Sequence, residues 1–423
     1  MKRIIASLLV ITAVGLSWPT VARADAVTDW NTIALDTIMG ASPARPGPVV
    51  FLDIAVVQAA VYDAVQAIGG KYKPYKVEIP GASGSPEAAT AKAARDVLVS
   101  IFPEKAESLD TMYRGYLTKK DLKENDPGVA VGEKAAAGII AMHANNVRVP
   151  NPSPDPFRGD TKPGMWRPTT SYQSGTPASD SPMATPWLGA VSSFTLKSGD
   201  QFRAKPPPAL TSEEYTKNYN EVKDLGAFSN SKRTEKQTEL GHFYAGASFK
   251  MVQTTLREMA EKHVDKIDDS ARLMALGTIA MADTAITCWD SKKHYLLWRP
   301  VTAIQEGEND GNPDTIGDPN WQPLTNTPNY PDYTSGANNV TAALTRTLSL
   351  FFGKDEMSFT VTSGNPKSEQ KTRNYSRFSD MSADMVDARI LQGIHFRFAD
   401  EAGREQGRQV AEWVFAHVGE KKK

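Results

Sequence analysis

Residues 51–68 read FLDIAVVQAAVYDAVQAI. Apolar side chains recur along this stretch at spacings of three and four residues, which is the pattern of an α-helix. Gly69 and Gly70 follow directly and predict where the helix ends, because glycine readily adopts the backbone conformation that closes a helix. The first half of the chain is expected to be mainly helical.

Helices are expected along most of the remaining chain. A capping-box pattern, Thr211-Ser212-Glu213-Glu214, predicts that helices resume after a long loop. Further helices are expected at residues 86–102, 128–146, 231–244, 248–263, 270–293, 338–352, 382–395 and 400–418. Few stretches alternate as a β-strand does, and no repeat has a fixed period. The prediction is an all-α fold of helical bundles.

Two long loops interrupt these helices. Residues 150–208 contain 12 of the 28 prolines, a density that no helix sustains. Residues 307–333 are also rich in proline and glycine. Loops of this length are often functional or wrap a neighbouring unit. We expect an N-terminal helical region at 25–210, which includes the 150–208 loop, and a C-terminal helical region at 211–423.

The composition excludes several classes of protein. The 423 residues are 40% hydrophobic, which is enough for a sizeable core. Lys and Arg number 48 and Asp and Glu number 49, so the sequence has no basic footprint for nucleic acid. The single cysteine, Cys288, excludes an internal disulfide and a cysteine-cluster metal site. After the N-terminus, no apolar run approaches the roughly 18 residues of a membrane span.

The N-terminus has the layout of a secretory signal peptide. Lys2 and Arg3 precede an apolar stretch at residues 4–18, and Ala22-Arg23-Ala24 provides small residues for cleavage before Asp25. An uncleaved anchor is the alternative. Residues 1–24 are therefore expected to direct export, with the mature chain in the periplasm or secreted. Its stability would then come from its core without disulfides.

Three stretches in the last third carry candidate binding residues. In the first, Lys292 and Arg299 are seven residues apart, so on one helix both would point from the same face, about 10 Å apart. Pro300 would then end that helix.

The other two stretches also suit an anion. In the second, Ser335-Gly336 at a helix start offers a hydroxyl and backbone N–H groups. In the third, Arg389 and His395 are six residues apart, about 120° around an ideal helix, and would converge only on a ligand between them. Taken separately, each stretch also fits solvated cations, an ordinary N-cap or a core histidine.

Together, in this order, the stretches resemble the signature of the vanadium-dependent haloperoxidase and type 2 phosphatidic acid phosphatase superfamily, in its bacterial haloperoxidase-like branch. Its pattern is K-x6-R-P, then P-S-G-H, then S-R-x5-H. Lys292, Arg299 and Pro300 complete the first part, and Arg389 and His395 match the third, where Ala388 replaces the usual serine. The resemblance continues over residues 196–226, 282–304, 318–352 and 388–415.

The resemblance implies two four-helix-bundle-like units with an oxyanion site between helices of the C-terminal region. Vanadate is the implied cofactor, or phosphate in the same site. Lys292, Arg299 and Arg389, together with Ser335 and Gly336, would hold its oxygens. His395 would bind vanadium through a ring nitrogen, or attack phosphorus in a phosphatase. Arginine is suited to such anions because it stays charged and has fork-shaped donors.

The second motif departs from the family at one position. It reads Thr334-Ser335-Gly336-Ala337, so the histidine that serves the family as an acid–base group is absent. Either the chemistry is slower, or another residue substitutes, or the site only binds an anion. His294 is the tentative catalytic substitute, and His242 is a weaker one. Asn338 and Asn339 can donate hydrogen bonds to an anion but do not titrate.

Three functions follow from the resemblance. The leading one is an exported haloperoxidase that oxidises a halide with hydrogen peroxide. The second is a soluble acid phosphatase that acts on a small phosphate ester through a phosphohistidine. The third is a non-catalytic binder of phosphate or vanadate, which the loss of histidine at Ala337 favours. No nucleic-acid partner and no membrane span in the mature chain are expected, and a homo-oligomer is compatible with the sequence.

Overall fold

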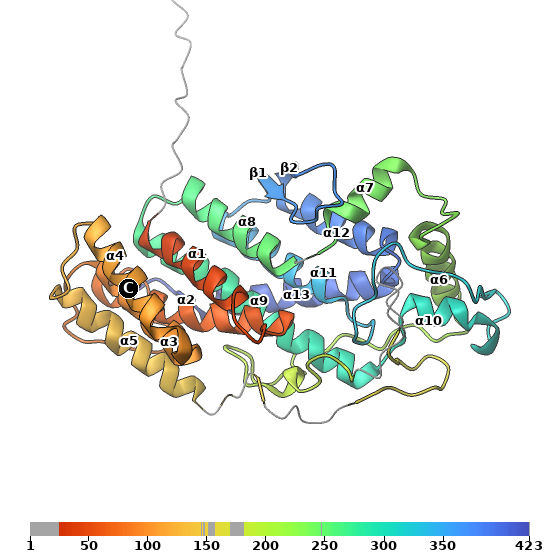
Figure 1. Ribbon diagram of the computed structural model, residues 1–423, viewed down its shortest axis with the longest axis horizontal. Helices are drawn as coiled ribbons and strands as arrows, with labels where there is room; N and C mark the ends of the chain where they lie inside the picture. The colour runs from red at the N-terminus through yellow and green to blue at the C-terminus, as the bar shows by residue number, and fades with distance from the viewer. Residues whose placement is uncertain are drawn as a thin grey trace, which may run out of the picture.

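A computed structural model describes residues 25–144, 146, 149–150, 157–169, 182–246 and 248–422. Within these residues the chain forms thirteen α-helices and one two-stranded hairpin, which confirms the predicted all-α fold. Figure 1 shows an elongated molecule, with helices α3, α4 and α5 at one end and α6, α7 and α10 at the other. The signal-peptide prediction for residues 1–24 lies outside the described residues.

The N-terminal helices are arranged around α2, which contains the apolar stretch at residues 51–68. It ends as predicted, because Gly70 closes it in the left-handed region at φ 68°. Helices α1 and α4 were not predicted, since their apolar spacing is interrupted by charged and polar residues. The bounds are Ala26–Met39 for α1, Gly47–Gly69 for α2, Pro86–Ile101 for α3, Ala106–Lys119 for α4 and Pro127–His143 for α5.

Helix α9, Ile267–Tyr295, connects the two halves of the molecule. One side packs on α2, and other faces pack on α11, Gly336–Phe352, and α13, Arg397–His417. The main apolar core runs continuously from α1 to α13 through α9. The expected division at residue 210 therefore crosses a shared core, and the two-region description stays a prediction.

The remaining helices surround this centre. The predicted helix at 248–263 coincides with α8, and Ser212 caps α6 by accepting from Tyr215 N. Short α10 was not predicted. The bounds are Glu213–Gly226 for α6, Glu235–Phe243 for α7, Ser248–His263 for α8, Pro300–Gln305 for α10 and Phe378–Leu391 for α12. Single 3-10 turns lie at Pro103–Lys105, Leu188–Ala190 and Gly307–Asn309.

A β-hairpin near the C-terminus is an element that the sequence did not predict. Strands β1, Glu356–Thr362, and β2, Thr372–Arg377, are antiparallel, with Phe359 paired to Tyr375. Alternate residues of β1 are buried against the core. Only a few residues alternate, which is why the pattern was too short to find.

The described part of the proline-rich 150–208 segment contains no α-helix, as predicted, and follows α9. Trp166 N donates to Leu296 O just after the end of α9. Farther along, the buried carboxylate of Asp283 accepts hydrogen bonds from Phe194 N and Thr195 N. This segment therefore wraps the helix that carries Lys292.

Among the described residues, one helix is long and apolar enough to pass a test for a membrane span. It is α2, and 94% of its most apolar window is buried inside the protein. A core helix passes the same test.

Candidate oxyanion site

The first motif is divided between two helices. Lys292 lies in the last turns of α9, which ends when Leu296 adopts a left-handed backbone at φ 50°. Arg299 is the N-cap of α10, and Pro300 is its first residue. The prediction that one helix carries both cations and ends at Pro300 was therefore wrong, because proline fits the first turn of a helix as readily as its end.

The third motif is divided in the same way. Arg389 lies in the last turn of α12, whereas His395 follows that helix in the linker to α13. Between them Gly393 has φ 77°, and a Cβ there would collide with Gly226 O. The helical-wheel angle predicted for the pair was wrong, because α12 ends at Leu391 and the chain leaves helical geometry before His395.

The second motif lies at a helix start, as predicted. Ser335 is the N-cap of α11 and its side chain makes no capping hydrogen bond, while its backbone N–H donates to Ala399 O at 2.9 Å. Because α11 begins at Gly336, the N–H groups of its first turn have no partner within the helix. These backbone donors lie beside α13, which brings them close to the third motif.

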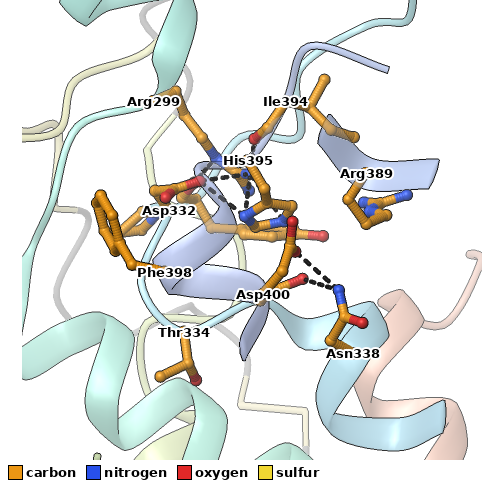
Figure 2. Close-up of polar contacts among 12 residues, drawn as sticks. Arg299, Asp332, Thr334, Asn338, Arg389, Ile394, His395, Phe398 and Asp400 are labelled. Carbon is orange, nitrogen blue, oxygen red and sulfur yellow. Dashed lines mark hydrogen bonds and ion pairs between the residues drawn. The ribbon is translucent and has the colours of Figure 1, made fainter. Parts of the chain in front are cut away.

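Arg299, Asp332 and His395 form the centre of the site (Figure 2). His395 Nδ1 lies 2.7 Å from Asp332 Oδ1, and Arg299 Nη1 lies 3.5 Å from the same oxygen. All three side chains are buried. The carboxylate makes close charge contacts, but neither oxygen has a well-aligned hydrogen bond within the described residues.

The tautomer of His395 follows from these contacts. A carboxylate beside Nδ1 favours the proton on that nitrogen and leaves the lone pair on Nε2. Arg299 Nη1 lies 3.1 Å from Nε2 and can donate to it. Burial, together with Arg299, Arg389 and Lys292, holds the pKa of His395 well below its usual value. The ring is therefore neutral, the form in which imidazole binds a metal.

Burial also changes the charge of Lys292. Its Nζ donates to Pro331 O at 2.6 Å and to Asp332 O at 3.1 Å. Burial lowers the pKa of Lys292 to about 7, which Arg299 also favours and Asp332 opposes. Burial raises the pKa of Asp332 to about 7, against Arg299 and Lys292. A bound anion would restore the lysine's charge, because the anion stabilises the cation.

Each of the two site arginines has one N–H donor group without a hydrogen-bond partner among the described residues. Arg299 donates to Tyr330 O and Ile394 O, and Arg389 donates to Gln392 Oε1 at 2.8 Å. Within the described residues, Arg299 Nη2 and Arg389 Nε are buried without a hydrogen-bond partner. A buried donor that lacks a partner costs about 1–3 kcal/mol. Two such donors are the strongest indication that the site is built for a ligand that accepts hydrogen bonds.

Sequence reasoning did not assign two acidic residues of the site. Asp332 precedes Ser335 by three residues, and Asp400 follows His395 by five. Asp400 Oδ1 accepts from Asn338 Nδ2 at 2.7 Å (Figure 2), and its carboxyl group also hydrogen-bonds Ser335. A carboxylate inside or beside each motif was the available signal, because buried cations require anionic partners.

Asn338 and Asn339 are engaged within the protein. Asn338 Nδ2 contacts Asp400 and Ser335, and Asn339 Nδ2 donates to Thr334 Oγ1 at 2.9 Å and to Ser335 O. Their amide donors hold the start of α11 in place. They position the second motif, and an anion would have to displace these contacts to use them.

A cavity of about 590 Å³ adjoins the cluster. Arg389, Gly336 and Ala337 line it, and so does His242. His294, in contrast, is exposed on α9 with its ring against Tyr295, and among the described residues no contact joins it to the site cations. Of the two histidines considered as substitutes at Ala337, the weaker candidate by sequence is the one that faces the cavity.

Comparisons with known proteins concern the fold and the part of the chain that contains the three motifs. Residues 272–422 match a family model described as VCPO second helical-bundle domain. This range contains Lys292, Arg299, Ser335, Arg389 and His395. No protein of curated function matches the chain by sequence.

Solved structures match nearly the whole chain. The crystal structure of the first bacterial vanadium-dependent iodoperoxidase has a TM-score of 0.76 and 24% identity, over 95% of this chain and 99% of that chain. The holo-type bacterial vanadium-dependent chloroperoxidase has a TM-score of 0.72 and 16% identity, over 94% and 98%. The apo-type bacterial vanadium-dependent chloroperoxidase has a TM-score of 0.70 and 17% identity, over 88% of this chain and 93% of that chain. The fold is haloperoxidase-like, which confirms the resemblance.

Proposed function

We propose that this chain is a vanadium-dependent haloperoxidase that oxidises a halide with hydrogen peroxide. The observation that carries the proposal is the pair of buried, unpartnered donors Arg299 Nη2 and Arg389 Nε beside neutral His395. A tetrahedral oxyanion with one or two charges satisfies such donors and balances three neighbouring cations. The fold shared with two bacterial vanadium-dependent haloperoxidases supports the same proposal.

The residues of the site fit vanadate. Arg299, Arg389 and Lys292 would hold its oxygens through charged N–H donors, and the start of α11 at Gly336 would add backbone N–H groups. His395 would bind vanadium through a ring nitrogen, with Asp332 beside Nδ1. At Nε2 this requires Arg299 Nη1, 3.1 Å away, to turn its hydrogen bond from the imidazole to the oxygens of the anion. When bound, vanadate activates hydrogen peroxide for two-electron oxidation of a halide.

The overall reaction consumes one proton. Halide and hydrogen peroxide give hypohalous acid and water: X⁻ + H₂O₂ + H⁺ → HOX + H₂O. Ala337 cannot supply this proton, and general acid–base help is typically worth about 10²–10⁴-fold. His242 lines the same cavity. The side-chain amide of Gln392 connects the neighbouring backbone to the site: its nitrogen donates to Gly241 O, and its oxygen accepts from Arg389. We propose that His242, rather than His294, exchanges protons with the cavity.

The same cations also suit a phosphate group, so the phosphatase stays an alternative. A neutral His395 would supply the lone pair that attacks phosphorus. The Ala337 substitution counts against both enzymes to a similar degree, because a phosphate ester also needs a proton for its leaving group. It is the observation that favours a non-catalytic oxyanion binder.

A paired assay separates the three functions. Purified protein, loaded with vanadate, is tested for peroxide-dependent oxidation of iodide, bromide and chloride, beside hydrolysis of 4-nitrophenyl phosphate without vanadate. We expect halide oxidation that His395→Ala abolishes together with vanadate binding. Vanadate binding without either activity would support the binder and end both enzyme proposals.

Export is part of the proposal and depends on residues 1–24 alone. Mass spectrometry of the protein from the culture medium or periplasm should give a mature N-terminus at Asp25. A full-length chain retained in the cell would contradict export.

A further inference from the structure

The cavity beside the candidate site has a polarity that suits one class of molecule. Its volume of about 590 Å³ falls within the range typical of small-molecule sites, about 300–1,000 Å³. Arg389 and the start of α11 line it on the side of the candidate site. Because Ala337 stands where the family has histidine, the space that an imidazole would fill adds to the cavity next to Arg389.

The walls of the cavity are largely apolar and aromatic. Phe51 from α2, Phe249 from α8 and Val340 from α11 contribute side chains from three helices. Trp289 and Tyr330 form a further wall, with ring centroids 5.0 Å apart at an angle of 55°. Such walls favour a flat aromatic ring, because aromatic pairs add about 0.5–1.5 kcal/mol to burial of their area.

Polar residues from the hairpin region complete the lining. His242, Asn365 and the exposed Lys367 line the cavity, and Asn365 Nδ2 donates to His242 O at 2.7 Å. His242 Nδ1 is buried without a hydrogen-bond partner within the described residues. Among the described residues that line the cavity there is no Asp or Glu. Its charge is therefore positive, and an anionic group is the complementary partner.

We infer that this cavity binds an electron-rich aromatic compound that bears one anionic group, such as a phenol carboxylate, and that the compound is halogenated there. The ring would lie against the aromatic walls, with its anionic group toward Lys367 and His242. The transfer step rests on the proposed haloperoxidase function. The binding step does not, because it uses residues of the cavity alone.

The chemistry balances with the reactants already named. For an aromatic ArH, the sum is ArH + X⁻ + H₂O₂ + H⁺ → ArX + 2 H₂O. The carbon–halogen bond forms and a carbon–hydrogen bond breaks. The halide loses two electrons, which reduce the peroxide to water. A ring held beside Arg389 would meet the oxidised halogen before it diffuses into solvent.

Binding is tested without peroxide or halide. Isothermal titration of the vanadate-loaded protein with 4-hydroxybenzoate and with phenol compares a charged and an uncharged ring. We expect tighter binding of 4-hydroxybenzoate. Lys367→Gln should weaken the binding of that compound about two- to five-fold, the usual range for an exposed charge pair. The affinity for phenol should stay unchanged. Lys236→Gln is the matched control, because Lys236 is exposed on α7, the helix that carries His242, and does not line the cavity.

Two further variants test the walls. Val340→Phe fills the cavity and should reduce binding of both compounds at least ten-fold. Phe249→Ala removes an aromatic wall without overpacking and should weaken the binding of both compounds. The test therefore still works if Val340→Phe fails to fold. Absence of 4-hydroxybenzoate binding, or equal affinity for the two rings, overturns the site.

Turnover tests the transfer step. With bromide and peroxide, 4-hydroxybenzoate and phenol compete for halogenation, and the product ratio is compared with that from reagent hypobromous acid. We expect the enzyme to favour 4-hydroxybenzoate at least three-fold more than the free reagent does. Identical ratios overturn transfer in the cavity. Specific binding without halide oxidation overturns the haloperoxidase proposal and the transfer step, and leaves the binding site established.

Discussion

His395 Nδ1 and Asp332 Oδ1 lie 2.7 Å apart, and both side chains are fully buried. The two residues come from segments on opposite sides of α11 in the sequence, and neither segment is helical at that point. A carboxylate at this distance favours the proton on Nδ1 and the lone pair on Nε2. Groups that orient a metal-binding histidine in this way contribute to metal affinity without touching the metal.

The first prediction concerns this contact. Asp332→Asn keeps the size of the side chain but removes its charge, so the imidazole ring of His395 is held less firmly in one orientation. Vanadate affinity should fall about 10–100-fold, as is typical when a group that orients a metal ligand is removed. Titration calorimetry measures the effect. Asp314→Asn, at an exposed position, serves as the control, and equal affinities in the two variants would exclude a positioning role for Asp332.

The second prediction is a pH dependence. Burial lowers the pKa of Lys292 to about 7, and only the protonated amine attracts an anion. Affinity for a tetrahedral anion should therefore be highest below pH 7 and fall as the pH rises through that value, with a midpoint shifted upward by the bound anion. Dilute tungstate is a suitable probe, because it stays a tetrahedral dianion through this pH range, so the change in affinity reports on the protein. In Lys292→Met the decline should become shallower without vanishing, because Asp332, whose pKa is also about 7, gains negative charge over the same range. A decline as steep as in the unchanged protein would exclude Lys292 as its source.

The third prediction restores the missing side chain. Ala337 faces the cavity, so Ala337→His should place an imidazole beside Arg389. Bromide oxidation should rise at least ten-fold, toward the range of about 10²–10⁴ that acid–base help provides. Steady-state kinetics of the vanadate-loaded enzyme measure this change. An unchanged kcat would mean that proton transfer does not limit turnover, or that another group already supplies the proton.

The fourth prediction distinguishes two histidines. Burial lowers the pKa of His242, as do Lys367 and Arg233, while Glu239 opposes them. If His242 exchanges protons with the cavity, His242→Gln should lower the rate of halide oxidation about ten-fold and change the acidic limb of the pH profile. His294→Gln, at an exposed position, should leave rate and profile unchanged. Equal effects of the two substitutions would argue against a role for His242.

The fifth prediction tests how closely α11 and α13 must approach. A Cβ at Gly407 would collide with Asn339 O, whereas a Cβ at Gly115 on α4 meets nothing within 4 Å. Gly407→Ala should destabilise the protein by about 1–3 kcal/mol and weaken anion binding by displacing the start of α11. Gly115→Ala should stabilise it by about 0.5–1 kcal/mol. Denaturant unfolding measures both, and similar values would show that the helices can separate without cost.

Local sequence patterns were enough to predict the helical character of this protein and the position of one part of its site. Apolar spacing and glycine stops depend only on neighbouring residues, so α2 and α8 could be predicted closely, and Ser335 could be placed at a helix start. The order of the three motifs then indicated the family of folds. Short α10 and the hairpin escaped detection because their patterns involve too few residues.

The assembly of the site could be learned only from the folded chain. Helical-wheel arithmetic placed Lys292 with Arg299, and Arg389 with His395, but it assumes that each helix continues between them. Leu296 ends α9, and Gly393 follows the end of α12, both in left-handed backbone conformations that local periodicity does not reveal. The buried carboxylates of Asp332 and Asp400, and the cavity at Ala337, likewise depend on contacts between distant segments. Spacing along a chain fixes direction only within one element, whereas a binding site is formed where several elements meet.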